Sequence, residues 1–242
     1  MKYILIVCAI IILSWFLYSL YRFFTLLHIS RNLVEESFAY SQAPTNSTKR
    51  ILIIGDSLGV GVGASSPSNS IAGRFAKDNP WAEIRNLSVS GAKIRDGLTT
   101  IKILKDTETY DLTLIQLGAN DITRLTSDKD INRDLKELLT IAKLHSNRVI
   151  FLTSGNVGHA PIFPFPINYY YTARSNRLIS LFQKISEDND VLYINLNYPR
   201  RDDPFLKNID LYYAPDLFHV SDASYEFWYQ RILKALNLPS KT

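Results

Sequence analysis

The chain has 242 residues, of which 46% are hydrophobic and 21% charged, and its formal net charge is +4. This balance is typical of a globular protein with enough chain for one well-buried domain. The mild positive excess includes no long basic run, so it indicates a solvated surface and no nucleic-acid partner. The single cysteine, Cys8, excludes an intramolecular disulfide framework and a cysteine-built zinc site.

The first element expected in chain order is a transmembrane helix over about residues 3–21, which reads YILIVCAIIILSWFLYSLY. It contains no charge, and a bilayer core needs roughly 20 apolar residues. Trp15, Tyr18 and Tyr21 gather toward its carboxyl end, as interfacial aromatic residues do. No small-x-small cleavage site follows, so we favour an uncleaved single-pass anchor, residues 1–30, over a signal peptide or a buried core helix. The positive charges on its two sides are nearly balanced, and we expect the domain on the extracytoplasmic side.

Residues 31–49 are polar and are predicted to form a linker, and residues 50–242 are predicted to form one domain. Short apolar runs in this domain alternate with amphipathic stretches of helical period. The runs are Ile51–Ile54, Ile84–Val89, Leu112–Leu117, Val149–Thr153 and Val191–Leu196, and the clearest helical stretches are 130–145, 173–188 and 222–236. Strands that are apolar throughout predict a parallel sheet of about five strands with helices on both faces, a three-layer α/β/α sandwich.

The first strand ends in a glycine-rich turn, GDSLGVGVGAS, at the sheet edge where such folds place their sites. Gly59, Gly61 and Ala64 match the dinucleotide pattern G-x-G-x-x-A. However, the second strand ends without the acid that would hold a ribose, and the lysine of a phosphate-binding loop is missing. The alternative is a turn that presents Ser57 as a nucleophile at the start of a helix, and we favour it.

A serine nucleophile needs a general base. His219 is the best candidate because Asp216 precedes it by three residues on the loop before the last helix. One loop can then supply the imidazole together with the carboxylate that orients it. The other histidines are weaker candidates: His28 lies beside the anchor, His145 closes a surface helix, and His159 follows the fourth strand without a nearby acid.

Two further residues at strand ends can stabilise a developing oxyanion. Gly91 follows the second strand in NLSVSGAKI and can direct a backbone N–H into the site. Asn120 follows the third strand in LGANDI and can offer its side-chain amide. A glycine turn or an Asn helix cap is common by itself, but four such residues at strand ends in this order point to an oxyanion hole beside a nucleophile.

These residues resemble the SGNH, or GDSL, hydrolase family, whose four namesakes would be Ser57, Gly91, Asn120 and His219. The resemblance covers Arg50 to the C-terminus and implies a flavodoxin-like α/β/α fold that uses no metal and no organic cofactor. It implies that Ser57 attacks an ester carbonyl, that His219 transfers its proton and that Asp216 orients the histidine. The N–H groups of Ser57 and Gly91, with the Asn120 side chain, would hold the oxyanion.

Two loops at the catalytic edge bear on the substrate. The loop GNVGHAPIFPFPINYYY after the fourth strand is rich in proline and aromatic residues, and the Arg200–Asp203 cluster on the other loop is expected to be a solvated turn. A tethered domain with apolar loops favours acyl or lipid esters. An envelope polysaccharide O-deacetylase, an acyltransferase and a non-catalytic binding module are the alternatives, and the sequence gives no oligomeric state.

Overall fold

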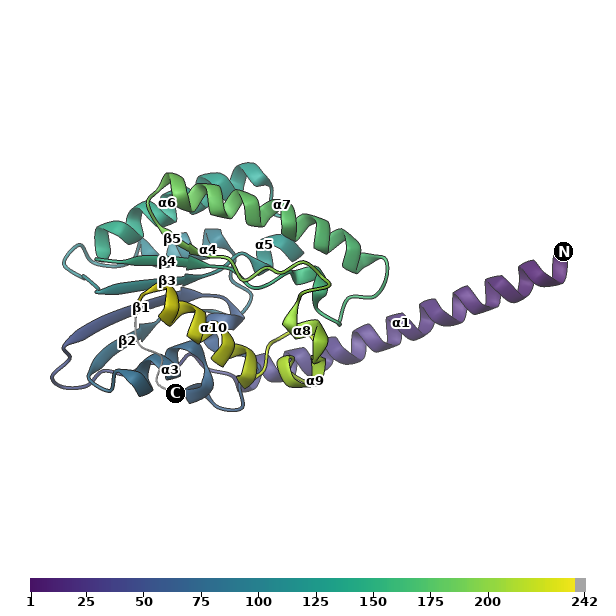
Figure 1. Cartoon of the computed structure of the whole chain (residues 1–242), viewed down its shortest axis with the longest axis horizontal. Helices are drawn as coiled ribbons and strands as arrows, with labels where there is room; N and C mark the ends of the chain where they lie inside the picture. The colour runs from purple at the N-terminus through teal and green to yellow at the C-terminus, as the bar shows by residue number, and fades with distance from the viewer. Residues whose placement is uncertain (238–242) are drawn as a thin grey trace.

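Five strands form one parallel sheet in the order β2-β1-β3-β4-β5 (Figure 1) in a computed structural model that describes residues 1–237. The strands are β1 (Lys49–Gly55), β2 (Ala82–Asn86), β3 (Leu112–Gln116), β4 (Val149–Leu152) and β5 (Leu192–Ile194). Each predicted apolar run overlaps one strand, and the predicted five-stranded parallel sheet is confirmed. The last five residues of the predicted domain lie outside the described residues.

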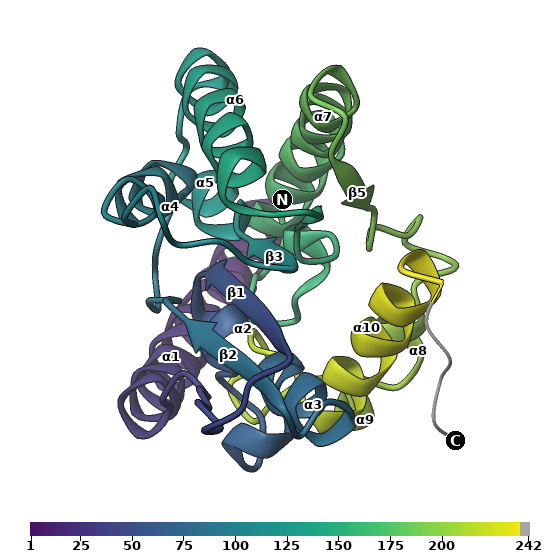
Figure 2. The ribbon, with the colours of Figure 1, turned by 90° about the vertical axis from the view of Figure 1, so that its left-hand side faces the viewer.

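Helices cover both faces of the sheet, which confirms the three-layer sandwich (Figure 2). One face carries α3 (Ile71–Asp78) and α10 (Asp222–Ala235), and the other carries α4 (Ile94–Ile101), α6 (Asp128–His145) and α7 (Ile167–Asp188). Short helices occupy the loops: α2 (Ser57–Val60), α5 (Ala119–Thr123), α8 (Pro204–Lys207), α9 (Ile209–Tyr212), and the 3₁₀ turns η1 (Pro67–Asn69) and η2 (Val157–His159).

Alternation of side chains along β1 builds the two cores. Ile51 and Ile53 pack in the core beneath α3 and α10, whereas Leu52 and Ile54 pack in the core beneath α4, α6 and α7. Successive side chains of a strand point to opposite faces, so a central strand covered by helices on both sides must be apolar at every position. This explains why the run Ile51–Ile54 shows no polar alternation.

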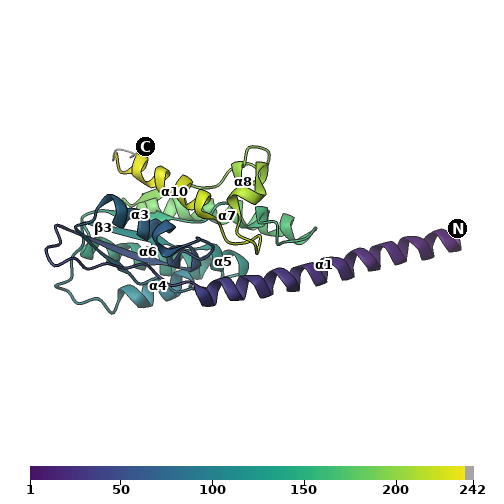
Figure 3. The ribbon, with the colours of Figure 1, turned by 90° about the horizontal axis from the view of Figure 1, so that it is seen from below.

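The N-terminal helix α1 (Lys2–Glu36) is longer than the predicted anchor. Its first half projects from the domain (Figure 3), and it is long and apolar enough to cross a membrane. The predicted boundary at residue 30 falls inside this helix. The helix continues because Leu26, Ile29 and Leu33 recur on one face at helical spacing, and this face packs against the domain.

The segment after α1 contacts the sheet edge. Gln42 pairs with Ile84 of β2 through two backbone hydrogen bonds of 3.0 and 2.8 Å, and its side chain donates to two further carbonyls. Residues 31–49, predicted as a linker, therefore include the end of a helix and a partner for the exposed edge strand. The predicted loop after β4 is also shorter than expected, because α7 begins at Ile167 and includes the three tyrosines.

Candidate active site

Ser57 lies where the sequence pattern predicts it, between the end of β1 and the start of a helix. It is the first residue of α2 and is half-buried. Asp56 caps this helix, because its Oδ1 accepts the Leu58 N–H at 3.0 Å. The cap fixes the turn, so the serine hydroxyl lies at the amino end of the helix, where the dipole favours negative charge.

Close packing explains two of the glycines in the turn after β1. Gly63 has φ of +89°, and a Cβ at this position would lie 2.4 Å from the Val220 carbonyl oxygen. A Cβ at Gly59 would lie 2.3 Å from Ser88 Oγ. Both positions therefore need glycine because neighbouring chain segments approach α2 closely, and one of these segments is the loop that carries His219.

The predicted His–Asp pair is formed. His219 Nδ1 lies 2.6 Å from Asp216 Oδ2, and Asp216 is fully buried. Asp216 Oδ1 also accepts the backbone N–H groups of Phe218 and His219 at 3.0 and 2.9 Å. Burial by itself raises the pKa of the Asp216 carboxyl, but the hydrogen bond and charge of His219 and these two N–H groups hold the pKa below its ordinary value. Asp216 is therefore an ionised carboxylate that keeps the His219 ring in place.

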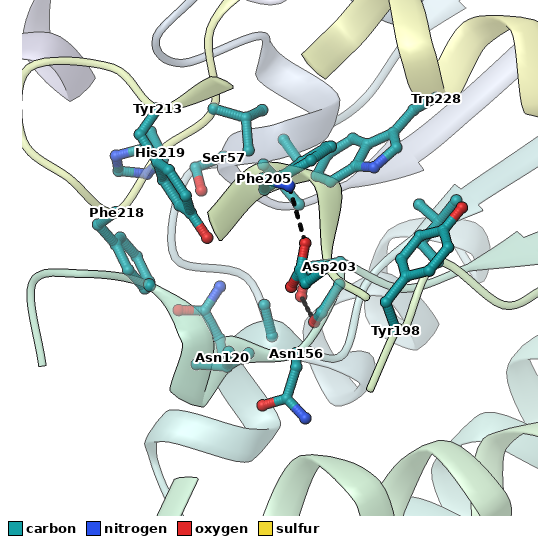
Figure 4. Close-up of a pocket in the computed structure, with 18 residues that line it drawn as sticks. Ser57, Asn120, Asn156, Tyr198, Asp203, Phe205, Tyr213, Phe218, His219 and Trp228 are labelled. Carbon is teal, nitrogen blue, oxygen red and sulfur yellow. Dashed lines mark hydrogen bonds between the residues drawn. The ribbon is translucent and has the colours of Figure 1, made fainter. Parts of the chain in front are cut away.

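Ser57, His219 and Asn120 line the same pocket (Figure 4). Apolar and polar side chains share the rest of the lining. The apolar ones include Val157, Leu196, Phe205, Phe218 and Trp228, and those with a polar group include Ser154, Asn156, Tyr198, Asp203 and Tyr213. Three of the predicted residues, far apart in the sequence, thus meet at the carboxyl edge of the sheet.

The two predicted oxyanion residues differ in their placement. Asn120 Nδ2 donates to the Ala92 carbonyl at 3.1 Å and to Asp56 Oδ2 at 3.4 Å. Gly91 has φ of +82° in the turn after β2 and lines a neighbouring cavity together with Ala92, not the pocket of Ser57. The turn of Gly91 is nevertheless joined to the pocket through the bond from Asn120 to Ala92.

Asp56 is a buried carboxyl group beside the serine. Burial is the main effect on it and raises its pKa to about 7, against the opposing effects of the Leu58 N–H, His219 and Asn120. Asp56 is 1% exposed and makes no hydrogen bond to a histidine within residues 1–237. Its charge therefore changes near neutral pH, directly next to the serine.

A second His–Asp pair lies at the same edge, and the sequence analysis missed it. His159 Nδ1 is 2.6 Å from Asp203 Oδ2, and Asp203 Oδ1 accepts the Phe205 N–H at 2.9 Å. The expectation that His159 has no nearby acid is wrong, because its partner comes from another loop. The expectation of a solvated turn is wrong for Asp203, which is 6% exposed, although Arg200 is exposed.

The inner half of α1 contacts the loop of His219. Ser30 Oγ lies 3.5 Å from His219 Nδ1, and Leu26 packs in a small cluster with Ala160 and Ile162. Ile162 in turn donates its N–H to the carbonyl of Leu217, next to Asp216, at 3.1 Å. The apolar spacing of residues 26–33 was the one signal in the sequence that could have indicated this contact.

Comparison with known proteins agrees with this geometry. The family described as GDSL-like Lipase/Acylhydrolase matches residues 53–227, which includes Ser57, Asn120 and His219. An arylesterase of Vibrio mimicus is 30% identical over 114 residues, which cover 46% of this chain and 56% of the relative. The matched segment thus spans little more than half of that curated relative.

Solved structures share the fold. An acetylxylan esterase from Geobacillus stearothermophilus, solved as a catalytic mutant, superposes with a TM-score of 0.61 at 16% identity, covering 82% of this chain and 100% of its own. An alpha/beta hydrolase enzyme from the metagenome of Lake Arreo, Spain, gives a TM-score of 0.62 at 18% identity, covering 80% and 98%. At these identities the likeness establishes a common fold.

Proposed function

The chain belongs to the GDSL-like lipase/acylhydrolase family, and we propose that it is an ester-hydrolysing enzyme that cleaves carboxylic esters through a Ser57–His219–Asp216 triad. The observation that carries this proposal is the His219–Asp216 pair, at 2.6 Å, on a pocket that Ser57 also lines. A base oriented by a buried carboxylate beside a serine at a helix start is the arrangement that activates a hydroxyl.

In the proposed reaction His219 Nε2 takes the proton of Ser57 Oγ as the oxygen attacks the ester carbonyl carbon. Collapse of the tetrahedral intermediate expels the alcohol, which receives that proton and leaves an acyl-serine. Water then attacks the acyl group while His219 takes one of its protons. Collapse of the second tetrahedral intermediate releases the carboxylic acid, and His219 returns that proton to Ser57 Oγ. Asp216 stays ionised throughout and stabilises the imidazolium of each transition state.

The oxyanion would be held by the Ser57 and Gly91 N–H groups and by the Asn120 amide. Asn120 Nδ2 keeps one hydrogen on Ala92, at 3.1 Å, and its second contact, 3.4 Å to Asp56, is long. A substrate oxygen can compete for that second hydrogen, because a 3.4 Å bond is weak. The Gly91 N–H would require its turn to approach the pocket when substrate binds.

We infer acyl or lipid esters as the substrate class, with the first half of α1 as a single-pass anchor and the domain on the extracytoplasmic side. The apolar side chains in the lining of the pocket, among them Phe205, Phe218 and Trp228, support an acyl chain as the bound group. The helix Lys2–Glu36 supports the anchor by its length and hydropathy.

An O-deacetylase that acts on a polysaccharide is the second candidate, and one observation favours it. The Asp203 carboxylate and the Asn156 side chain line the pocket among aromatic rings, and such groups can bind the hydroxyls of a sugar. The acetylxylan esterase that shares the fold acts on an acetylated polysaccharide by its name.

The test uses the full chain in detergent micelles with p-nitrophenyl acetate and p-nitrophenyl octanoate. We expect Ser57→Ala to abolish hydrolysis of both, with Ser65→Ala, on the same turn but outside the pocket, as the matched control. A preference for octanoate supports the lipid esterase, and a preference for acetate supports the deacetylase. Full activity of Ser57→Ala would disprove the triad, and a folded wild type inactive on both esters would point to an acyltransferase.

A further inference from the structure

We propose that an aromatic rim beside the pocket, formed by Phe165, Ile167, Tyr169 and Tyr170, inserts into the surface of the bilayer that α1 spans, so that the pocket opens toward that membrane. The proposal rests on the proposed anchor and is independent of the catalytic assignment. All four side chains of the aromatic rim are exposed, with Phe165 at 62% and Tyr169 at 61%.

The direction of α1 places the catalytic edge toward the membrane. The free half of α1 projects on the side of the domain where the loop before α7 and the short helices α8 and α9 lie (Figures 1 and 3). These elements belong to the carboxyl edge of the sheet, where Ser57 and His219 lie. A bilayer around residues 3–21 would therefore face this edge of the domain.

A contact between Phe165 and Trp15 of α1 sets the depth of the aromatic rim in the bilayer. The ring of Phe165 lies 6.4 Å from the ring of Trp15 and 5.8 Å from that of Tyr169. Trp15 precedes Tyr21, the end of the uncharged stretch, by six residues, which correspond to about 9 Å along a helix. Interfacial apolar groups are buried about 5–10 Å into a bilayer surface. Phe165 thus lies at the depth where Trp and Tyr side chains gather in membrane proteins.

The aromatic rim is fixed to α1 and does not swing freely. The Arg22 side chain donates to the Pro161 carbonyl at 3.0 Å, and Leu26 packs against Ala160 and Ile162 one turn further along. These contacts hold the segment between η2 and α7 against the helix just outside the proposed bilayer. The depth of Phe165 therefore follows from the position of α1.

A series of aromatic side chains leads from the aromatic rim to the pocket. Phe163 lies two residues before Phe165, and its ring is 5.8 Å from that of Phe218, which lines the pocket beside His219. Phe163 also packs 4.7 Å from Tyr171 on α7. The rings of Phe163, Phe218 and Tyr171 thus form an uncharged surface between the aromatic rim and the pocket, over which an acyl chain from the bilayer can pass.

Other exposed apolar residues of the domain provide the contrast. Trp81, Ile103 and Leu144 are 65%, 70% and 76% exposed. Trp81 directly precedes β2, Ile103 follows the end of α4 and Leu144 lies in the last turn of α6, so all three lie near the edge of the sheet where the strands begin. This edge faces away from the side where α1 projects. Single exposed apolar residues are ordinary, whereas a cluster beside a membrane-spanning helix indicates a membrane contact.

The experiment measures the depth of single labels in the full chain. In a Cys8→Ser background, cysteine is introduced at Phe165, Tyr169 or, as the matched control, Leu144, and labelled with an environment-sensitive fluorophore. The protein is inserted into phosphatidylcholine vesicles containing spin-labelled lipids. We expect blue-shifted emission and strong quenching at 165 and 169, and aqueous emission without quenching at 144.

Two controls separate this proposal from the proposed membrane anchor and from the proposed esterase activity. Resistance to carbonate extraction tests the anchor, and hydrolysis of p-nitrophenyl acetate in detergent tests the esterase without any bilayer. The proposal is overturned if the labels at 165 and 169 behave like the label at 144 in carbonate-resistant protein, or if the protein is extracted by carbonate.

A kinetic test adds a second readout. The double variant Phe165→Ser with Tyr169→Ser should lower hydrolysis of a long-chain ester presented in vesicles by about tenfold, because α1 still anchors the chain but the pocket is no longer held against the bilayer surface. Hydrolysis of soluble p-nitrophenyl acetate should stay at the wild-type rate, because neither side chain lines the pocket. Equal losses on the two substrates would contradict a membrane role, and Leu144→Ser should change neither.

Discussion

Two His–Asp pairs lie at one edge of the sheet, and their local geometry is almost the same. Both join Nδ1 to a carboxylate Oδ2 at 2.6 Å, and both aspartates accept a backbone N–H from the residue two positions later. All four side chains are nearly buried. Hydrogen-bond geometry alone therefore does not distinguish the two pairs.

The orientation of each pair toward the pocket distinguishes them. His219 lines the pocket and Asp216 lies behind it, whereas Asp203 lines the pocket and His159 is not part of its lining. One pair presents an imidazole that can move a proton, and the other presents a carboxylate that can accept a hydrogen bond. In the proposed function the same two residue types would thus serve as a base in one place and as a binding group in the other.

The largest expected effect tests this difference directly. We expect His219→Gln to lower kcat by at least about 10⁴-fold, as loss of a triad member does in other enzymes. His159→Gln should lower kcat by less than about tenfold, because glutamine can still donate to Asp203. Both are measured with p-nitrophenyl acetate, with circular dichroism as the control for folding. Comparable losses from the two substitutions would remove the distinction between the pairs.

Asp56 extends the comparison to a buried carboxyl group that makes no hydrogen bond to a histidine within the described residues. Its pKa is about 7 in the folded chain and about 3.8 when unfolded, so the unfolded chain loses its proton first as pH rises. The free energy of unfolding should therefore fall by about 4 kcal/mol from this group between pH 4 and pH 8. Asp56→Asn should lack this fall, so its stability relative to wild type should improve with pH in urea titrations.

Asp216 behaves in the opposite way. The folded pKa of Asp216 is lowered, so its ionisation adds stability that is present above the ordinary carboxyl range and is lost only at lower pH. The Asp216 carboxyl itself therefore adds no fall in stability between pH 5 and pH 8. A stability difference between Asp56→Asn and wild type that stays constant from pH 4 to pH 8 would contradict the assigned pKa of Asp56.

The sequence predicted the local parts of this site well. The five strands, the turn at Ser57 and the D-x-x-H loop are each encoded within a few residues, so their patterns are visible without the fold. The predicted ends of the strands were less accurate where packing against neighbouring elements decides them. The run predicted at Val191–Leu196 yields a strand of only Leu192–Ile194, because β5 is an edge strand with one neighbour.

The contacts between residues far apart in the sequence were missed for a physical reason. His159 and Asp203 are 44 residues apart and lie on loops after β4 and β5, and only the strand order brings these loops together. The contact of Ser30 with His219 spans 189 residues and depends on how α1 lies on the domain. Neither pairing has a local spacing that a sequence pattern can detect.

A smaller effect is expected at the second pair. Asp203→Asn should raise KM by about tenfold for an ester whose alcohol carries hydroxyl groups, because a charged acceptor is lost from the pocket. Hydrolysis of p-nitrophenyl acetate, which has no hydroxyl, should change by less than about threefold. Asp202→Asn is the matched control, since Asp202 is exposed and outside the pocket. A loss of kcat on both esters would assign Asp203 to the chemistry.

The smallest effect concerns the contact that only the first pair makes with α1. Ser30 Oγ lies 3.5 Å from His219 Nδ1, at the outer limit of a hydrogen bond, and Asp216 already occupies that nitrogen at 2.6 Å. Ser30→Ala should therefore reduce kcat by only about two- to threefold, with KM unchanged. Thr25→Ala, one turn earlier on an exposed position, should change neither constant.

Removal of the whole of α1 should lower the hydrolysis rate more than removal of the Ser30 hydroxyl does. A chain without residues 2–21 keeps Leu26 and Ser30, so in solution it should hydrolyse p-nitrophenyl acetate at close to the full-length rate. A chain without residues 2–36 exposes the loop of His219 and loses the cluster around Leu26, so it should be less active and less stable to urea. Equal activity of the two chains would show that α1 is only a tether, and that the pair Asp216–His219 holds its geometry without the helix.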